Sequence, residues 1–226
     1  MKFKDIEELA KWNDEMVTKY HKDGTLFESK NFILALMEKN RLKQIIKLSD
    51  VKKEDTVLDL GCGEGHLLNL LPEVKEITGL DISKVALSRA NTLLKDRTNI
   101  KLLFGSAEDT KFENNSFDKI FCSEVLEHVP DPKKVIEEIY RILKKDGILV
   151  VSIPDEKRIK TIMNILDKTR LKKLLYAARK DKDYEWHLHE ADLNFLKTIV
   201  GDLFHVDKIK RVPFLLGYRF VIKLKK

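Results

Sequence analysis

The sequence has little cysteine and no long hydrophobic run, and both absences narrow the class of protein. Only two cysteines, Cys62 and Cys122, occur among 226 residues. They are too few for a framework of several disulfides, and too few by themselves for a zinc site. No segment approaches the roughly 18 apolar residues that a membrane-spanning helix needs, and the first residues lack the apolar core of a signal peptide. We therefore expect a soluble, cytoplasmic protein.

Runs of proline, glycine or serine that would mark a linker are also missing, as are internal repeats. With 43% hydrophobic residues, the chain is long enough to bury one sizeable core. The formal charge of +6 is modest, but residues 157–182 contain ten basic and only two acidic residues. We expect a single domain, residues 1–226, with its positive charge concentrated in that segment.

The spacing of apolar residues changes twice along the chain. Before residue 50 it is helical, and it predicts helices at 4–20 and 27–48. The middle of the chain alternates, with expected strands at 56–60, 76–81, 100–104, 118–122 and 147–153, and helices at 65–71, 83–95 and 132–144. The last part predicts helices at 156–180 and 190–200, then strands at 204–212 and 217–224 that can pair as a hairpin. Strands that alternate with helices indicate a parallel sheet covered on both faces.

Three glycines at alternate positions, Gly61, Gly63 and Gly65, follow the first expected strand in the stretch VLDLGCGEG. On the first strand-to-helix turn of an open parallel sheet, glycines let a ligand approach the backbone closely. Counted from Gly61, the phosphate-binding loop needs glycine and then lysine at the positions of His66 and Leu67. The dinucleotide fingerprint needs its third glycine at the position of His66 as well. The spacing therefore disfavours both a nucleotide held by a phosphate-binding loop and a dinucleotide such as a nicotinamide cofactor.

Two aspartates narrow the choice of ligand further. Asp81 ends the second expected strand, where a carboxylate is suited to accept hydrogen bonds from both hydroxyls of a ribose. Asp59 lies just before the glycines, and its negative charge favours a cation and repels a pyrophosphate. A positively charged nucleoside without phosphate, such as S-adenosylmethionine, fits this pattern.

Four successive motifs, VLDLGCGEG, GLDIS, GSAEDTKFENNSFDKIFCSEVLEHVPDP and LKKDGILVVSIP, cover about residues 55–154. They resemble the motifs of class I S-adenosylmethionine-dependent methyltransferases, in particular the branch of ubiquinone and menaquinone biosynthesis methyltransferases. The resemblance implies a three-layer, Rossmann-like α/β fold. Its mostly parallel, seven-stranded sheet would have the order 3-2-1-4-5-7-6, with helices on both faces. The chain would divide into a helical cap (1–50), a cofactor-binding core (51–154), a basic helical insertion or lid (155–203) and a C-terminal β-hairpin (204–226).

The resemblance also implies which residues hold S-adenosylmethionine, whose product after transfer is S-adenosylhomocysteine. The expected cofactor contacts lie on the glycine loop and at the ends of the following strands: Asp59, Gly61, Cys62, Gly63, Gly65, Asp81, Ile82, Ser106, Ala107, Glu108, Ser123, Glu124 and Val125. Ser106 stands where the family more often has aspartate, so its hydrogen bond to the adenine amino group would lack the assistance of a charge.

A catalytic base is needed only if the acceptor atom carries a proton. His128 in LEHVPD is one candidate, because the ordinary pKa of histidine lies near neutrality. A structural role at the turn before the next helix is the alternative for His128. Glu124 is the second candidate for a base.

Four further residues are expected to contact the acceptor: Tyr20, His21, His187 and His189. The two histidines of EWHLHEADL lie where the family builds a lid over the acceptor, and surface positions are the alternative for them. Packing of the N-terminal helix is the alternative for the other two residues. No third ligand accompanies His187 and His189, so no metal site is expected.

The acceptor itself is less defined. Many enzymes of the family that methylate base amino groups carry an Asn-Pro-Pro-aromatic tetrad after the fourth strand, where this chain has SEVL. We expect in-line displacement onto a small or lipophilic metabolite. Residues 157–182 would then rest on an anionic membrane, or form a solvated lid helix. An RNA methyltransferase that uses this stretch on phosphates and a non-catalytic S-adenosylmethionine-binding protein are the other hypotheses. The sequence does not indicate an oligomeric state.

Overall fold

The computed structural model describes residues 3–22, 24–28, 32–167, 186–212 and 217–226. The helices are α1 (Ile6–Tyr20), the short 3-10 helix η1 (Leu26–Glu28), α2 (Phe32–Ser49), α3 (His66–Leu70), α4 (Lys84–Leu93), α5 (Pro132–Ile142), α6 (Glu156–Asp167) and α8 (Leu193–Val200). The strands are β1 (Thr56–Leu60), β2 (Glu76–Asp81), β3 (Ile100–Phe104), β4 (Phe117–Ser123), β5 (Leu143–Pro154), β6 (His205–Val212) and β7 (Arg219–Lys225).

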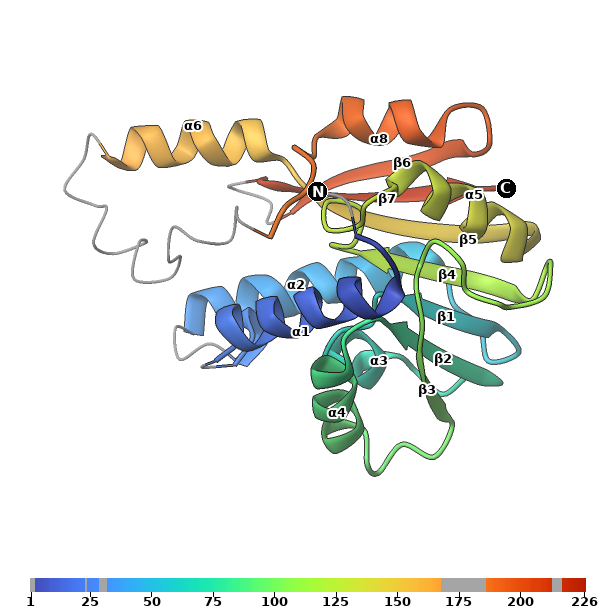
Figure 1. Cartoon of the computed structure of the whole chain (residues 1–226). Coiled ribbons are helices and arrows are strands. Elements are labelled where there is room, and N and C mark those ends of the chain that lie inside the picture. Colours follow the sequence, from blue (N-terminus) through green and yellow to red (C-terminus); the bar gives the residue numbers. More distant parts are fainter. Residues whose placement is uncertain (1–2, 23, 29–31, 168–185, 213–216) are drawn as a thin grey trace.

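The strands form one seven-stranded sheet in the order β3-β2-β1-β4-β5-β7-β6 (Figure 1). The first five are parallel, and β7 lies antiparallel to both β5 and β6. Both neighbours of β1 are parallel to it, with Leu58 opposite Thr78 on one side and Ile120 on the other. The expected fold, including the C-terminal hairpin, is confirmed.

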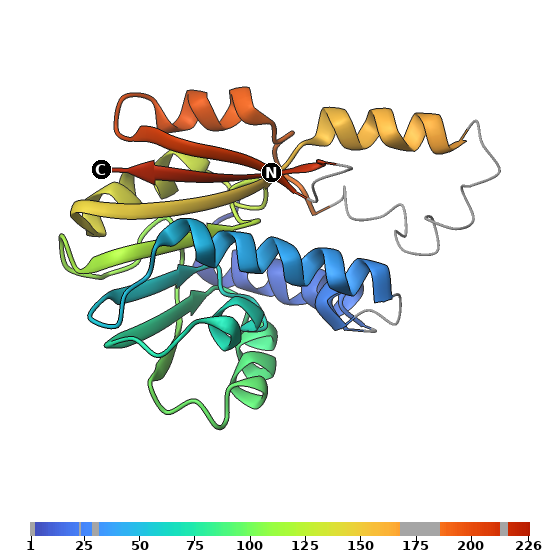
Figure 2. The same ribbon diagram turned by 180° about the vertical axis from the view of Figure 1, so that it is seen from behind.

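Helices cover both faces of this sheet (Figures 1 and 2). Buried residues of α5 and α8 belong to one apolar cluster, and those of α2, α3 and α4 belong to a second cluster on the opposite face. Strand β5 is continuously buried from Gly147 to Pro154, as expected for a parallel strand covered on both sides. Helix α6 extends away from the sheet in both views.

Many boundaries differ from the sequence prediction by one to three residues, and the helix expected from residue 27 begins only at Phe32. The change from α5 to β5 differs in kind. The helix expected to reach residue 144 ends at Ile142, and β5 begins directly at Leu143 instead of at residue 147. Leu143 is fully buried and pairs with Phe117, so burial of this side chain draws the chain into the sheet one turn early. Asp146 has a φ of 64°, a left-handed conformation that a continuing helix would not contain. Residues 168–180 of the helix expected at 156–180 lie outside the described residues.

Helix α1 is attached to the sheet through α4. Ser83 caps α4, its side chain accepting a hydrogen bond from the amide of Ala86. Asp14 of α1 in turn accepts hydrogen bonds from the Ser83 hydroxyl (2.6 Å) and the Val85 amide (3.0 Å). The N-terminal helix is therefore fixed beside the loop that follows β2. No described helix is long and apolar enough to cross a membrane.

Candidate active site

A cavity of about 680 Å³ lies beside the ends of β1, β2 and β4. It is bounded by the loops that follow these strands, by the helices α1 and α2, and by the segment around Trp186. All thirteen expected cofactor contacts line it except one: Gly65 is absent from the wall. The cavity therefore joins the glycine loop to the region in which the sequence places the acceptor.

The three glycines of the loop after β1 all have left-handed backbone angles, with φ values of 74°, 51° and 82° in chain order. A Cβ atom at Gly61 would lie 2.4 Å from Val125 Cγ2, and one at Gly65 would lie 2.9 Å from Leu94 Cδ1. A Cβ atom at Gly63 would meet nothing within 4 Å, and Gly63 lines the cavity. Two of these glycines thus allow close packing, and only Gly63 presents bare backbone to open space.

Two carboxylates flank this loop, Asp59 buried and Asp81 partly buried. Asp81 Oδ2 accepts a hydrogen bond from the Gly63 amide (2.7 Å), and Oδ1 accepts one from the Ser83 amide (2.8 Å). Burial nevertheless raises the pKa of Asp81 above its usual value. Asp59 is only 2% exposed, and burial together with the charge of Asp81 raises its pKa to about 8. The site therefore favours a ligand that brings a positive charge close to Asp59.

The turn expected to meet the adenine is held by its own hydrogen bonds. Ser106 Oγ accepts from the Glu108 amide (3.1 Å), so this hydroxyl can still donate to a ligand. Glu108 Oε1 accepts from the Asp131 amide (2.8 Å) and thereby ties this turn to the N-terminus of α5. Ala107 lines the cavity between these two residues.

The end of α1 closes the side of the cavity next to the glycine loop. Glu64 accepts hydrogen bonds from His21 Nδ1 (3.0 Å) and from Arg89 (2.7 Å), and Arg89 also donates to the His21 carbonyl oxygen (3.1 Å). The ring of Tyr20 stacks on Trp186 with centroids 5.9 Å apart. The expected contacts Tyr20 and His21 therefore do line the cavity.

Trp186 is a site residue that the sequence reasoning missed. Its ring lies against three others, at centroid distances of 5.9 Å from Tyr20, 5.7 Å from His21 and 4.7 Å from His128. It directly precedes His187, which also lines the cavity. An aromatic residue at the edge of the lid segment was the available signal.

The two histidines of the lid segment, His187 and His189, have different surroundings. His187 Nδ1 is 2.8 Å from Glu156 Oε1, whereas His189 Nε2 donates to the Val129 carbonyl oxygen (2.9 Å). His189 is not among the residues that line the cavity. The spacing of two residues thus brings only His187 to the site.

A buried network of four charged side chains forms another part of the wall. Glu38 and Arg41 come from α2, Glu124 follows β4, and Arg219 begins β7. Arg41 binds Glu38, while Arg219 donates to Glu124 (2.7 Å) and to Glu38 (3.3 Å). Burial opposes ionisation of Glu38, but the two arginines lower its pKa to about 2. The two positive and two negative charges balance.

This network also decides the state of Glu124, one of the two candidates for a base. Its Oε1 accepts from the Ser152 hydroxyl (2.9 Å), and its Oε2 accepts from Arg219. Despite burial, the charges of Arg219 and Arg41 lower the pKa of Glu124. Arg41 also donates to Ser123 (2.6 Å) and Ser152 (2.8 Å). A carboxylate held in this way fits a structural role and does not favour general-base catalysis.

His128, the other candidate, is neutral. Burial and the neighbouring His187 lower its pKa to about 4, although a hydrogen bond to the Trp186 carbonyl oxygen (3.1 Å) opposes the shift. Because a carbonyl oxygen only accepts, Nδ1 of His128 carries the proton and Nε2 carries the lone pair. This nitrogen can accept a proton or bind a metal ion.

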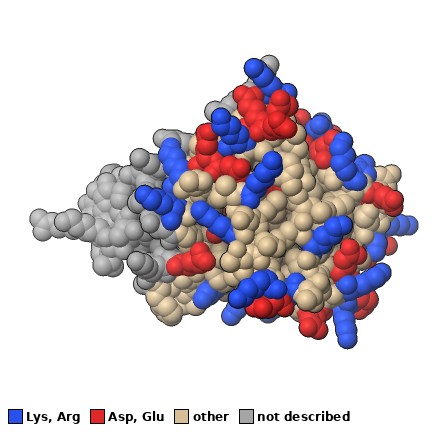
Figure 3. Space-filling view, turned by 60° about the horizontal axis from the view of Figure 1, so that its bottom comes forward, with Lys and Arg blue, Asp and Glu red and all other residues tan. Residues whose placement is uncertain are grey.

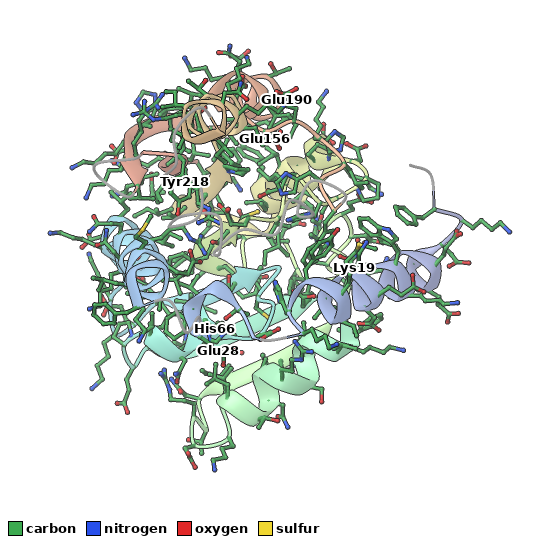
Figure 4. The ribbon with its side chains drawn as sticks, turned by 90° about the vertical axis from the view of Figure 1, so that its left-hand side faces the viewer. Lys19, Glu28, His66, Glu156, Glu190 and Tyr218 are labelled. Atoms are coloured by element: carbon green, nitrogen blue, oxygen red, sulfur yellow. The ribbon has the colours of Figure 1, made fainter. Side chains whose placement is uncertain are left out.

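Among the residues that the structure describes, two groups of three side chains have ligand atoms close enough to hold a metal ion. One is Glu127, His128 and His187; the other is Glu28, Glu64 and His66. Glu28 and His66 lie next to each other in Figure 4. The second group is less suited, because Glu28 is exposed and Glu64 already binds Arg89 and His21.

The described part of the basic segment does not present bare positive charge. Lys157 pairs with Asp192 (2.5 Å) and Lys160 with Glu190 (2.9 Å). The face drawn in Figure 3 likewise shows basic and acidic side chains interspersed. Residues 168–182, which hold most of the expected positive charge, lie outside the described residues.

Comparisons with known proteins place this fold and site in a family. Residues 51–196 match the model of the family described as "Methyltransferase domain". The uncharacterized protein MJ1252 of Methanocaldococcus jannaschii is 33% identical over 188 residues, 80% of this chain and 72% of that protein. The demethylmenaquinone methyltransferase of Staphylococcus aureus is 31% identical over 168 residues, 68% of this chain and 66% of its own length.

The fold is shared with solved structures as well. The N-methyltransferase NodS from Bradyrhizobium japonicum, in complex with S-adenosylhomocysteine, superposes with a TM-score of 0.69 over 94% of this chain and 97% of that one, at 16% identity. The chain therefore belongs to the methyltransferase domain family. It is a class I S-adenosylmethionine-dependent methyltransferase, and S-adenosylmethionine is its cofactor.

The described residues fit this cofactor. Bare backbone at Gly63 borders open space, as a closely approaching ligand requires. The partly buried carboxyl of Asp81 lies at the end of β2, where a ribose can be bound. Asp59 is a buried carboxyl whose ionisation a nearby sulfonium would favour.

Proposed function

We propose that the enzyme methylates a small or lipophilic acceptor enclosed in the cavity between α1, the loop after β4 and the segment around Trp186. One observation carries this proposal: a single cavity is continuous from the glycine loop to the cluster of Tyr20, His128 and Trp186. Its volume of about 680 Å³ lies in the usual range for small-molecule sites. Aromatic rings suit a flat or apolar acceptor.

The cofactor would occupy the end of the cavity near the glycine loop. Backbone at Gly63 would lie against it, Asp81 would accept hydrogen bonds from the ribose, and the turn at Ser106 would meet the adenine. When bound, S-adenosylmethionine supplies an electrophilic methyl group on a sulfonium. Asp59 would stabilise positive charge there, and the residues Ser123 to Val125 would border the acceptor. The protein's main tasks are alignment and exclusion of water.

The name of one relative supports this class of acceptor. A demethylmenaquinone methyltransferase, named for a lipophilic quinone, is among the similar proteins. The hypothesis of an RNA substrate rests on the basic segment, and its described lysines Lys157 and Lys160 are paired with carboxylates. Contact with an anionic membrane would rest on the same segment, whose described lysines are neutralised in the same way.

Binding and transfer assays test the proposal. Isothermal titration should show S-adenosylmethionine and S-adenosylhomocysteine binding to the protein. The variant Asp81→Ala should bind at least tenfold more weakly, a loss of about 1.4 kcal/mol. Asp96→Ala is the control and should leave binding unchanged, because Asp96 is exposed and does not line the cavity.

The class of acceptor is then tested with labelled methyl. Transfer to an organic-solvent extract of small and lipophilic compounds, but not to RNA from the same cells, is the expected result. Transfer to RNA alone would overturn the proposed acceptor class. Cofactor binding without transfer to either fraction would indicate a non-catalytic binding protein.

A further inference from the structure

Three side chains at the acceptor end of the cavity have the composition and spacing of a metal site. Glu127 and His128 follow β4, and His187 lies 59 positions after His128 in the segment before α8. Each offers one ligand atom, and these atoms lie within 4.8 Å of one another. All three residues line the cavity. The fold thus brings His187 next to Glu127 and His128, which lie far from it in the sequence. The sequence pattern around His187 did not reveal these two ligands.

Glu127 is the unusual member of this group. It is only 1% exposed, and its Oε2 atom has no hydrogen-bond partner among the described residues. A buried carboxylate oxygen without a partner is unfavourable unless a proton or a cation satisfies it. The nearest arginines, Arg41 and Arg219, are held by Glu38 and Glu124. The unpaired, buried carboxylate oxygen therefore belongs to a residue that has a ligand atom within 4.8 Å of a nitrogen of each histidine.

Both histidines are oriented by hydrogen bonds at Nδ1. His128 Nδ1 donates to the Trp186 carbonyl oxygen (3.1 Å), and His187 Nδ1 lies 2.8 Å from Glu156 Oε1. Glu156 is the first residue of α6 (Figure 4), is 3% exposed, and also accepts from the Ala191 amide (3.3 Å). Carbonyl and carboxylate partners of this kind fix metal-binding histidines, directing the other ring nitrogen to the ion.

We propose that Glu127, His128 and His187 bind one divalent transition-metal ion, with Glu156 orienting His187. Two imidazole nitrogens and one carboxylate oxygen favour Zn²⁺ or Mn²⁺ over Mg²⁺ and Ca²⁺, which prefer oxygen ligands alone. Three protein ligands leave a position open for water or an acceptor oxygen. The binding of the ion stands on the geometry alone. Its use in orienting an oxygen-bearing acceptor rests on the proposed function.

Metal titration of the full-length, tag-free protein tests the proposal. After dialysis against a chelator, isothermal titration should show one Zn²⁺ or Mn²⁺ bound per chain, and at least tenfold weaker binding of Mg²⁺. Glu127→Gln and His187→Ala should each weaken Mn²⁺ binding at least tenfold. Glu156→Gln should weaken it about 10–100-fold, the usual effect of losing a partner behind a ligand.

His189→Ala is the matched control, because His189 lies two residues from His187 but binds Val129 instead. It should bind Mn²⁺ like the unaltered protein. Visible absorption of the Co²⁺ complex gives a second readout: its intensity should fall in Glu127→Gln and stay unchanged in His189→Ala. Thermal unfolding and titration with S-adenosylhomocysteine show whether each variant is folded.

The absence of stoichiometric binding of Zn²⁺ and Mn²⁺ would overturn the proposal, as would an equal loss in His189→Ala and His187→Ala. The two proposals fail separately. If S-adenosylhomocysteine binds and no metal does, the metal site is wrong and the proposed function stands. If a metal binds and no acceptor of the proposed class is methylated, the site stands and the acceptor class is wrong.

Discussion

The two ends of the cavity are built in different ways. At the cofactor end, Asp59, Gly61 and Gly63 lie within five residues of one another, and Asp81 reaches the loop through a hydrogen bond to the Gly63 amide. The groups that we expect to recognise the cofactor there are backbone atoms and carboxyls at strand ends. One short motif contains most of these groups, so the chemistry of the cofactor end can be predicted from the sequence.

At the acceptor end the same space is enclosed by residues from remote segments. Tyr20 of α1 stacks on Trp186, and Arg41 of α2 reaches Ser123 and Ser152 at the ends of β4 and β5. These contacts join side chains to side chains from segments that lie far apart in the sequence. We infer that a local motif binds the cofactor, whereas the acceptor end depends on tertiary contacts between remote segments.

Breaking the charged network should have the largest effect. In Arg219→Met, Glu124 and Glu38 would each lose a buried cationic partner. We expect the free energy of unfolding to fall by about 3–5 kcal/mol, the usual result of leaving a buried charge unpaired. Urea unfolding at pH 7 measures it.

The matched control is Lys133→Met, since Lys133 is exposed and pairs with Glu137 at 3.9 Å on the surface of α5. Its change should stay within about 0.5 kcal/mol. Equal losses in both variants would mean that the network at the acceptor end is no more important to stability than a surface ion pair.

Alanine at the glycines separates packing from ligand contact. Gly61→Ala should lower the free energy of unfolding by roughly 2–4 kcal/mol, because Cβ would meet Val125 Cγ2 at 2.4 Å and φ is positive. The double variant with Val125→Ala should recover part of this loss. Chemical denaturation of the single and double variants provides the measurement.

Gly63→Ala should lower the free energy of unfolding by only about 1–2 kcal/mol, the penalty of a left-handed backbone. Its binding of S-adenosylhomocysteine should nevertheless weaken at least tenfold, because the new methyl group occupies the space next to the backbone. Unchanged binding in Gly63→Ala would contradict the placement of the cofactor at this glycine.

Much of the fold was predictable from the sequence, and the reasons are local. Alternating apolar segments predicted the parallel sheet, and the pairing of β6 with β7 followed from two strands joined by a short connection. The start of β5 was not predictable from periodicity, because residues near Leu143 continue the helical spacing of α5. Only its pairing with Phe117 decides the boundary.

The acceptor end was less predictable. Glu38 and Arg41 sit in a helix rich in charge, where charged residues usually face solvent, and their burial depends on Arg219 from the far end of the chain. Glu127 adjoins the candidate His128, but nothing local shows that its carboxylate is buried without a partner. Such pairings between distant segments have no periodicity to reveal them.

The pH dependence of Asp59 tests the cofactor end. Its pKa in the folded protein is about 8, well above the value of about 3.9 for an unperturbed aspartate. The folded state therefore binds more protons than the unfolded state between about pH 4 and pH 8. Over this window the contribution of Asp59 to stability falls as the pH rises, because the buried carboxyl must ionise.

Asp59→Asn should remove this dependence. At pH 8.5 we expect it to raise the free energy of unfolding by about 2 kcal/mol or more, since each pKa unit corresponds to about 1.4 kcal/mol, with little change at pH 4.5. Thermal unfolding across this range measures the difference. The same variant should bind cationic S-adenosylmethionine less well, relative to neutral S-adenosylhomocysteine, than the unaltered protein does. A stability difference that is independent of pH would exclude Asp59 as the titrating group.

The smallest effect on stability is expected at the contact between α1 and the N-terminus of α4. Asp14→Ala removes the hydrogen bonds from Ser83 and Val85 that attach α1 to the N-terminus of α4. The free energy of unfolding should fall by about 1 kcal/mol, as for the loss of a helix-capping contact. Binding of S-adenosylhomocysteine should weaken as well, because Ser83 follows Asp81 by two residues and its amide holds the Asp81 carboxylate.

Asp5→Ala is the comparison, since Asp5 caps α1 through the Glu8 amide and, within the described part of the chain, makes no hydrogen bond to α4. It should destabilise the protein by a similar amount and leave binding of S-adenosylhomocysteine unchanged. If Asp5→Ala and Asp14→Ala weaken binding equally, α1 acts on the cofactor end only through its own helicity. If only Asp14→Ala weakens the binding of S-adenosylhomocysteine, the position of α1 affects Asp81 through the contact between Asp14 and Ser83. The two ends of the cavity are then coupled.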